Sequence, residues 1–229
     1  SIITVAFRNY EGIVKTWASL AHLAEAHDLS FEWIVVDGGS QDGTAEFLEN
    51  LNGQYRLRYV SEKDKGIYDA MNKGLARATG NYVLFLNSGD SLYDTRTLDT
   101  VVERGNGADI IYGETKLVDE HRHIIGDRRH SAPEYFNWKS FRYGMNICHQ
   151  AIYIKRSLAA PYDTQYQLSS DIDWIIKAAK KANKTVNVER YVAKYLVGGT
   201  SQKRHRQSLQ ERYAILKKYY GTLPNIINH

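Results

Sequence analysis

The chain has 229 residues, a hydrophobic content of 43%, a single cysteine and a formal net charge of +4. These totals suit one domain with a full core, and they exclude a disordered chain and a disulfide scaffold. No run of eighteen apolar residues occurs, which excludes a membrane-spanning helix, while the mild basic excess is compatible with anionic substrates or an anionic membrane face.

The first 90 residues alternate between two apolar patterns. Short runs rich in β-branched residues predict strands, and apolar residues spaced three or four apart predict the helices between them. The strands are expected at 1–7, 32–37, 56–60 and 82–86, and the helices at 11–27, around 47–51 and at 67–79, with Gly80 as a C-terminal cap. This alternation with short loops predicts βαβ units, hence an α/β fold with a mostly parallel central sheet and helices on both faces.

The fourth of these strands is the most informative. Its five apolar residues suit a strand buried on both faces of a parallel sheet, and it ends abruptly in Asn87-Ser88-Gly89-Asp90. Ligands of open α/β sheets bind at the carboxyl ends of the strands, so Asp90 is expected at the mouth of a cleft. A carboxylate there suits Mg²⁺ or Mn²⁺, which prefer oxygen ligands and often share them with phosphate. A solvated strand-end turn is the alternative.

After Asp90 the rhythm changes. Helices are expected at 95–104 and 169–182, strands at 108–114, 147–154 and 185–197, and a hairpin within 115–129. Residues 131–146 are rich in aromatic side chains, which either form a satellite core or a flap over a sugar or acceptor. From Lys203 to Tyr219 the chain predicts a basic amphipathic helix, which either packs on the domain or lies on anionic lipid.

Two strand ends present a carboxylate, Asp37 and Asp90, on the same edge of the predicted sheet. Asp37 could accept hydrogen bonds from a nucleoside, and a metal on Asp90 could hold a diphosphate. At the start of the helix at 169–182, Asp171 or Asp173 could be a general base, although both could simply cap the helix. The dinucleotide-binding, P-loop, nucleophile-elbow and zinc motifs are all absent from the sequence.

Four stretches in this order resemble a family 2 glycosyltransferase of the nucleotide-diphosphosugar transferase (GT-A) fold. The resemblance is closest to the enterobacterial exopolysaccharide branch and its colanic acid fucosyltransferase, and the second half of the chain matches more loosely. The matching stretches are residues 1–9, 36–44 (VDGGSQDGT), 65–74 (KGIYDAMNKG) and 84–90 (LFLNSGD).

The resemblance implies one glycosyltransferase domain over residues 1–229. Its nucleotide-sugar half would be 1–90, its acceptor-side half 91–202, and its basic C-terminal helix 203–229. Asp171 would be the catalytic base, with Asp173 as the competitor, and Asp90 the metal ligand for Mg²⁺ or Mn²⁺. The residues implied to bind the nucleotide-sugar are Thr4, Ala6, Phe7, Asp37, Asp69, Asn72, Ser88 and Asp90.

Four residues are candidates for lesser roles on the acceptor side. His149, in a stretch that resembles the acceptor-side strand of this branch, could contact acceptor or phosphate. His205 could be a late metal ligand, and Arg204 and Arg206 could neutralise the leaving diphosphate. For each of them a purely structural or solvated role is the alternative. The closing loop of this branch resembles residues 198–202.

Two departures from the family pattern favour a rival interpretation. Ser88 replaces the first Asp of the D-x-D motif, and Ser170 replaces the Glu before Asp171. The implied function is inverting transfer of a hexose or fucose from a nucleoside-diphosphate sugar to a growing exopolysaccharide or lipid-linked oligosaccharide. The rival is a non-catalytic nucleotide-sugar-binding or scaffold protein of a polysaccharide assembly complex. A sugar-nucleotide pyrophosphorylase would need a Gly-rich basic loop where Arg8-Asn9-Tyr10-Glu11 stands.

The implied partners and location follow from this function. A saccharide or lipid-linked saccharide acceptor is expected, and no nucleic acid. The single cysteine, Cys148, fits a reducing compartment. We therefore expect a cytoplasmic location, with peripheral contact at the inner membrane face through the basic helix.

Overall fold

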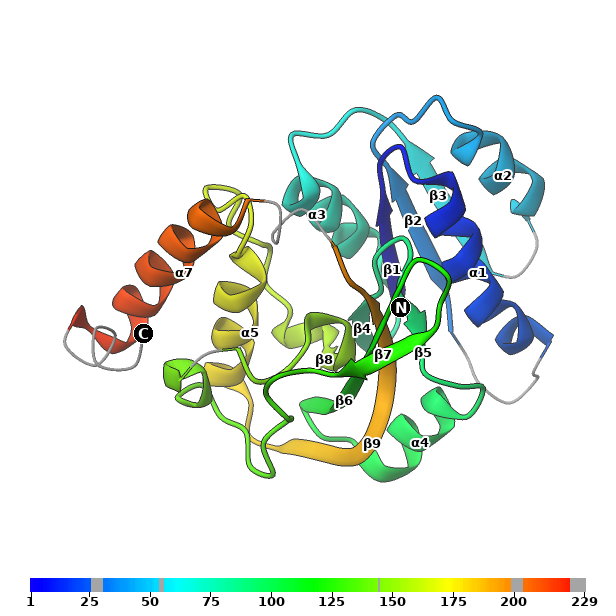
Figure 1. The fold of residues 1–229 in the computed structure, drawn as a ribbon. Helices are drawn as coiled ribbons and strands as arrows, with labels where there is room; N and C mark the ends of the chain where they lie inside the picture. Colours follow the sequence, from blue (N-terminus) through cyan, green and yellow to red (C-terminus); the bar gives the residue numbers. More distant parts are fainter. Residues whose placement is uncertain (26–30, 54–55, 144, 199–203, 223–229) are drawn as a thin grey trace.

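The computed structural model describes residues 1–229 except 26–30, 54–55, 144, 199–203 and 223–229. In the described residues nine strands form one sheet in the order β3-β2-β1-β4-β8-β6-β9-β5, and β7 pairs with β6 (Figure 1). The first four strands pair in parallel, as the sequence predicts. Their bounds are β1 Ile2–Ala6, β2 Trp33–Asp37, β3 Leu57–Ser61 and β4 Tyr82–Phe85.

The helices of this half are α1 Tyr10–Glu25, α2 Thr44–Leu51 and α3 Ile67–Arg77. They cover both faces of the sheet. Ile3 and Val5 of β1 pack in one core cluster with Met71 of α3, whereas Ile2 packs in the other with Leu20 of α1. Successive strand residues therefore serve opposite faces, which explains why their apolar runs are continuous instead of alternating.

The second half of the sheet is mixed. β8 is antiparallel to both β4 and β6, β9 is parallel to β6, and the hairpin predicted within 115–129 is formed by β6 and β7. The bounds are β5 Ser91–Leu92, α4 Thr97–Gly105, β6 Ile110–Val118, β7 Ile124–Asp127, β8 Ile152–Lys155, α5 Ser170–Lys181, β9 Thr185–Leu196 and α7 His205–Tyr220.

Two local predictions are wrong. Gly80 does not cap α3, because the helix ends at Arg77 and the capping residue is Ala78. The strand expected from residue 147 begins only at Ile152, since His149–Ala151 form a short 3-10 helix (η2) that turns the chain into β8. The Gly80 N–H makes tertiary hydrogen bonds to Ser1 and Glu32, whereas η2 is closed by a local bond from the N–H of Ala151 to the Cys148 carbonyl.

The aromatic segment at 131–146 belongs largely to the core. Phe136 and Phe141 are buried and pack edge to face on each other, within the cluster that also contains residues of α5. Tyr135, by contrast, is 80% exposed. The two phenylalanines are therefore core residues, as the first interpretation expected, but they belong to the cluster against the central sheet and not to a separate satellite core. In the described part of the chain, no helix is both long enough and apolar enough to cross a bilayer.

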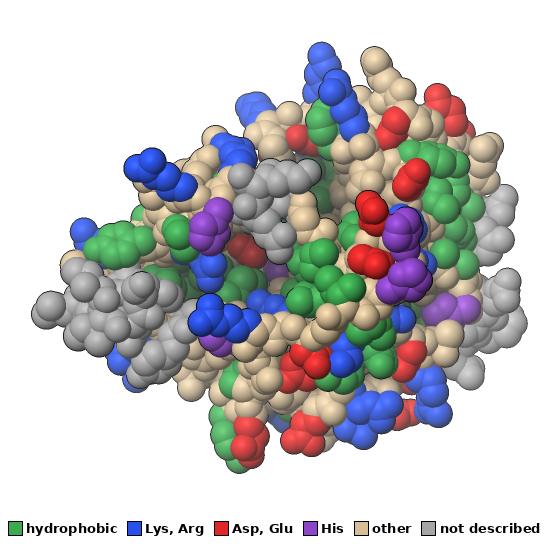
Figure 2. Space-filling view, in the orientation of Figure 1, with side chains coloured by type: hydrophobic (Ala, Val, Ile, Leu, Met, Phe, Trp, Pro, Cys, Tyr) green, Lys and Arg blue, Asp and Glu red, His purple; other side chains and the backbone are tan. Residues whose placement is uncertain are grey.

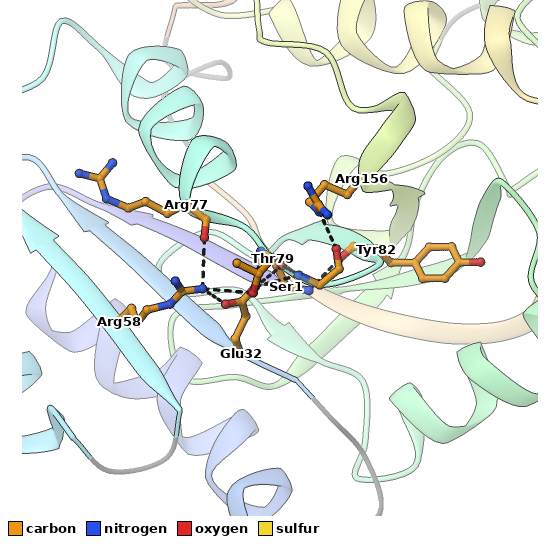
Figure 3. A network of polar contacts seen from close by, with 8 residues as sticks. Ser1, Glu32, Arg58, Arg77, Thr79, Tyr82 and Arg156 are labelled. Carbon is orange, nitrogen blue, oxygen red and sulfur yellow. Dashed lines mark hydrogen bonds and ion pairs between the residues drawn. The ribbon is translucent and has the colours of Figure 1, made fainter.

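Opposite the carboxyl edge of the parallel strands, a polar network joins segments that are distant in the sequence (Figure 3). Glu32 accepts hydrogen bonds from the backbone N–H of Thr79 at 2.7 Å and of Gly80 at 3.0 Å, and it forms an ion pair with Arg58. Its side chain is only 14% exposed. These contacts hold the turn after α3 against the start of β2.

We expect Glu32→Ala to lower the free energy of unfolding by roughly 2–3 kcal/mol, because it leaves the Thr79 N–H without its acceptor, leaves the Gly80 N–H with Ser1 Oγ alone and removes the ion-pair partner of Arg58. Urea unfolding followed by circular dichroism would measure the change. The matched control is Glu62→Ala, which removes a half-exposed ion pair with Lys73 and should cost well under 1 kcal/mol. Equal losses in the two variants would contradict the role assigned to this network.

Candidate functional site

The carboxyl end of β1 presents an open aromatic ring. Phe7 is 57% exposed, and the guanidinium of Arg8 lies 5.1 Å from its ring centroid. Gly38 lies against it: a Cβ at this position would come within 2.9 Å of Phe7 Cδ2 and 2.6 Å of Asp64 Oδ2. The glycine therefore allows the loops after β1, β2 and β3 to meet. An exposed ring at this edge is a suitable stacking surface for a nucleobase.

Asp37 is fully buried at the end of β2. One carboxylate oxygen accepts hydrogen bonds from the backbone N–H of Ser40 at 2.9 Å and from Ser61 Oγ at 2.6 Å, while the other accepts from Ser40 Oγ. Asp37 thus braces the loop after β2 against the end of β3. Its predicted contact with a base or ribose stays a prediction.

Thr4 and Ala6 are buried within the sheet. Thr4 Oγ1 donates to the carbonyl of Leu86 at 2.7 Å and accepts from Trp33 Nε1 at 2.9 Å, so it links β1 to its neighbours on both sides. Ala6 packs in the core on the α1 side. Both residues pack inside the protein and stabilise the pairing of β1 with its neighbours. Direct contact between either of them and a ligand remains a prediction.

The two residues predicted on α3 are placed differently from each other. Asp69, in the first turn, is partly exposed and accepts a hydrogen bond from the backbone N–H of Lys65 at 3.0 Å. Asn72 pairs reciprocally with the backbone of Tyr162: Oδ1 accepts from its N–H at 2.7 Å and Nδ2 donates to its carbonyl at 3.0 Å. Asn72 therefore fixes the 156–169 segment, with its phenol Tyr162, to α3.

The loop after β4 holds Asp90 inward. The carboxylate is 4% exposed, and it accepts hydrogen bonds from the backbone N–H of Leu196 and from Gln150 Nε2, both at 2.9 Å. Burial raises the pKa of Asp90 to about 7 despite these bonds. Gly89 adopts a φ of 103°, and a Cβ there would lie 2.8 Å from Leu196 Cδ2. Ser88 Oγ donates to the carbonyl of Asn9 at 3.2 Å.

No feature of the sequence pointed to a separate role for Asn87. Its Oδ1 is buried and has no hydrogen-bond partner in the structure. An unsatisfied buried acceptor is costly and calls for an explanation such as an absent water or ion. Asn87 and Asp90 form the ends of one turn, in which the N–H of Asp90 donates to the Asn87 carbonyl at 2.9 Å.

The side chains of Asn87 and Asp90 are the candidate ligands for the predicted metal ion. In the described residues no group of three or more His, Cys, Asp or Glu side chains could hold an ion. Asp90 and the free Oδ1 of Asn87 are oxygen donors, the type that Mg²⁺ and Mn²⁺ prefer. The protein side of such a site therefore fits an ion that takes most of its ligands from a diphosphate and water.

Asp171 lies in the first turn of α5 and faces α3. Its Oδ1 accepts a hydrogen bond from the hydroxyl of Tyr68 at 3.2 Å. Burial raises the pKa of Asp171, and hydrogen bonds from the N–H of Ile172 and from Tyr68 offset only part of that effect. The side chain is therefore a better proton acceptor than an ordinary aspartate, as a general base requires.

Asp173, the competitor, is fully buried. Its carboxylate forms ion pairs with Lys177 at 2.6 Å and Lys218 at 3.0 Å and accepts from the Tyr219 hydroxyl at 2.7 Å. Burial raises its pKa, but these partners outweigh burial and leave the pKa lowered. A carboxylate paired with two ammonium groups, with a lowered pKa, is a poor base, so the geometry favours Asp171.

A cluster of stacked aromatic side chains lies next to Asp171. Tyr162 stacks on Tyr68 at 5.4 Å and on Trp174 at 4.9 Å, and a 2.7 Å hydrogen bond joins its hydroxyl to His149 Nε2. Burial lowers the pKa of His149 to about 3, so the imidazole is neutral. His149 is enclosed by this aromatic cluster, which supports a structural role for it.

Tyr195 of β9 precedes Leu196, whose backbone N–H donates to Asp90. Burial is the largest cause that raises its pKa to about 12, and the charges of Asp90 and Asp171 both add to it. The phenol therefore lies near both carboxylates. Nothing in the local sequence pattern around Tyr195 indicated this, because only the path of β9 across the sheet brings it there.

The start of α7 carries the predicted cations. Arg204, His205 and Arg206 are exposed, and Arg204 donates to Gln167 Oε1 at 3.2 Å. Figure 2 shows the surface hollowed between α5 and β7, with Lys and Arg side chains around the hollow. Residues 199–202 of the predicted closing loop lie outside the described residues.

Comparison with known proteins gives a consistent result. The family model described as Glycosyl transferase family 2 matches residues 1–160. A PGL/p-HBAD biosynthesis glycosyltransferase of Mycobacterium bovis is 35% identical over 157 residues, 64% of this chain and 57% of that protein. An uncharacterized glycosyltransferase of Mycobacterium tuberculosis is 31% identical over 188 residues, 78% of this chain and 68% of that protein.

Solved structures show the same fold. Crystal structures of S. aureus TarS superpose with a TM-score of 0.69 over 96% of this chain and 42% of that one, at 18% identity. The complex of TarS 1–349 with UDP-GlcNAc gives 0.67 over 99% of this chain and 69% of that one, also at 18% identity. The predicted GT-A fold is confirmed. The chain spans 57% of the length of the first curated relatives it matches.

Proposed function

Since the chain belongs to glycosyl transferase family 2, we propose that it transfers a sugar, with inversion, from a nucleoside-diphosphate sugar to a hydroxyl of a saccharide acceptor. The observation that carries this proposal is Asp171, a carboxylate of raised pKa held by Tyr68 beside the carboxyl edge of the sheet. The TarS complexes with UDP and with UDP-GlcNAc support a nucleotide-sugar as the donor class.

The reaction needs one proton acceptor and one leaving group. Asp171 takes the proton from the acceptor hydroxyl, whose oxygen forms a bond to the anomeric carbon. The bond from that carbon to the diphosphate oxygen breaks on the opposite face, and the nucleoside diphosphate leaves with the electron pair. A positioned base of this kind contributes about 10²–10⁴-fold in rate.

The donor would lie along the edge formed by the loops after β1, β2 and β4. Phe7 offers its ring to the base, Asp37 organises the loop beneath, Asp69 faces the same edge from α3, and Ser88 lies beside Asp90. A divalent cation on Asp90, with Asn87 Oδ1 as a second donor, would supply positive charge to the diphosphate.

Tyr68→Phe should move the acid limb of the kcat profile to higher pH. The Tyr68 hydroxyl donates to the ionised form of Asp171, so its removal disfavours that form. On the acid limb, where Asp171 is mostly protonated, we expect kcat to fall about fivefold, the equivalent of one hydrogen bond of roughly 1 kcal/mol. Tyr166→Phe on the neighbouring segment is the control, and an identical pH profile in both variants would remove Tyr68 from the mechanism.

We propose further that the acceptor is a lipid-linked oligosaccharide of exopolysaccharide synthesis, met at the cytoplasmic membrane face. Two large apolar side chains of α7, Leu209 and Tyr213, are 48% and 40% exposed on the same side of the helix, with Arg206 and Lys217 beyond them also exposed. This pattern suits contact with anionic lipid. The enterobacterial colanic acid branch, and with it a fucosyl donor, stays part of this proposal.

Sedimentation with vesicles would test the membrane contact. The protein should bind vesicles that contain phosphatidylglycerol and not neutral ones, and the double variant Leu209→Ser/Tyr213→Ser should lose most of that binding. Glu103→Ser on α4 serves as the control. Binding that the double variant retains would place the membrane contact elsewhere.

The donor proposal is tested by thermal unfolding with GDP, UDP, GDP-fucose, UDP-glucose and UDP-galactose, each with and without Mn²⁺. A ligand at about 100 times its dissociation constant stabilises by roughly 2.7 kcal/mol, which shifts the melting temperature measurably. Transfer or hydrolysis of the donor that stabilises would establish the enzyme. Stabilisation without any turnover would favour the non-catalytic scaffold, and no stabilisation at all would contradict both.

A further inference from the structure

The start of α5 is capped by α7 and not by its own side chains. Three successive backbone N–H groups donate to the carboxylate of Glu211: Gln167 at 3.1 Å, Leu168 at 2.8 Å and Ser169 at 3.1 Å. Ser169, the N-cap residue, makes no side-chain cap bond, and its Oγ donates to the Ser208 carbonyl at 3.3 Å. These N–H groups precede Ser170, the first residue of α5, so Glu211 anchors the segment that leads into the helix. Its negative charge near the positive end of the helix is also favourable.

A second contact pins the other end of α7 to the same helix. Asp173 of α5 receives the ammonium of Lys218 at 3.0 Å and the hydroxyl of Tyr219 at 2.7 Å. Ile215 and Leu216 of α7 are buried between the two anchors. The first turn of α5, which contains Asp171, is therefore held on either side by groups that α7 supplies or receives.

We propose that Glu211 is a positioning residue for Asp171, an inference that rests on the proposed function of Asp171 as the base. Asp171 follows Ser169 by two residues, so the amides that Glu211 holds lead directly into the turn that carries the Asp171 carboxylate to Tyr68. A misplacement of about 1 Å in a reacting group can cost about 10²-fold in rate.

The surroundings of Asp171 predict a second consequence. Tyr68 of α3 donates to it, and the groups near enough to interact with its charge are Tyr162 from the 156–169 segment, Tyr195 from β9 and Arg212 from α7. Burial among them keeps the carboxyl pKa raised. When the first turn loosens, water reaches the carboxylate and favours its ionisation, whereas a weaker hydrogen bond from Tyr68 opposes it. Burial is the larger of these effects, so the pKa of Asp171 should fall.

The experiment compares Glu211→Ala and Glu211→Gln with Gln210→Ala, an exposed neighbour on α7. We expect Glu211→Ala to lower kcat about tenfold to a hundredfold while the donor KM and the nucleotide dissociation constant stay within about twofold, because the donor half is untouched. Glu211→Gln keeps one acceptor oxygen and should lose less. Gln210→Ala should match the parent protein.

Carbon NMR of the Asp171 carboxyl provides a measurement that needs no turnover. Its titration midpoint should move to lower pH in Glu211→Ala and stay near the parent value in Gln210→Ala. An unchanged midpoint in the folded variant, with or without a lower melting temperature, overturns the positioning role. If Glu211→Ala does not fold, the same comparison is made with Glu211→Gln. If the parent protein transfers no sugar, the proposed function fails, and the titration still decides the inference.

Discussion

Asp171→Asn should reduce transfer about 10²–10⁴-fold and leave nucleotide binding intact. The amide has nearly the same shape and can still accept a hydrogen bond from Tyr68, so the fold around the first turn of α5 should persist. It cannot take a proton at neutral pH. Burial of an ionisable carboxyl costs free energy, and its removal should leave the melting temperature equal or higher.

Steady-state kinetics and nucleotide binding by calorimetry measure the two halves of this prediction. Asp99→Asn on α4 is the matched control, because it removes one carboxylate outside the site. Asp173→Asn tests the competing base: it should lower the melting temperature markedly, since it weakens the ion pairs to Lys177 and Lys218, with a smaller loss of kcat. The reverse order of the kcat losses would transfer the role of base to Asp173.

Asp90→Asn should remove the part of nucleotide-diphosphate binding that depends on Mn²⁺. The carboxylate is the ionisable oxygen donor at the end of β4, and an amide in its place lacks the negative charge. Gln150 can turn its amide over to meet the new group, so the hydrogen bond between these side chains can be kept. Binding of nucleotide without metal should change little.

The pH dependence of the same site has a definite sign. Asp90 has a pKa of about 7 in the folded protein and an ordinary value near 3.8 when unfolded. Between these values the folded state keeps a proton that the unfolded state releases, so ionisation of Asp90 lowers stability as pH rises through this window. A cation that binds the ionised form must displace this proton below pH 7. Mn²⁺ should therefore bind about tenfold more weakly at pH 6 than at pH 8.

Two measurements decide this prediction. Calorimetric titration of the nucleotide diphosphate with Mn²⁺ at both pH values should show the difference in the parent protein and in Asp99→Asn. Asp90→Asn should show neither the metal dependence nor the pH dependence, and at pH 8 it should be no less stable than the parent. Metal-dependent binding that survives in Asp90→Asn would place the cation on other groups.

The structure confirms the predicted strands and helices where the sequence pattern reflects local structure. Ile2 and Ile3 fall on opposite faces of the sheet, so a continuous apolar run was a sound sign of a doubly covered strand. The pattern misled where tertiary partners replace local ones. Residues 147–151 alternate as a strand would, yet η2 occupies them, and Gln150 uses its side chain to hold Asp90. Gly80 looks like a helix cap but instead donates its N–H to Glu32.

The same distinction between local pattern and tertiary contact applies to the residues of the candidate site. Thr4 and Asp37 stand at the expected strand and strand end, but burial turns their side chains to protein partners, which no spacing could reveal. Glu211 had one signal: it is the only acid in the basic stretch 203–220. An isolated opposite charge in such a helix is a candidate for a buried tertiary contact.

By itself the sequence determined the parallel order of the first half, and it proposed the carboxyl edge as the site and Asp171 and Asp173 as candidate bases. These features depend on contacts near in the chain or on the apolar period of strands and helices. Only the tertiary structure showed which of the two carboxylates has no ion pair with a lysine. Asp173 is neutralised by Lys218, and the turn bearing Asp171 is held by Glu211, both from a helix about forty residues further along the chain. Burial and charge pairing of this kind arise only when distant segments meet, and they set the pKa values on which the chemistry depends.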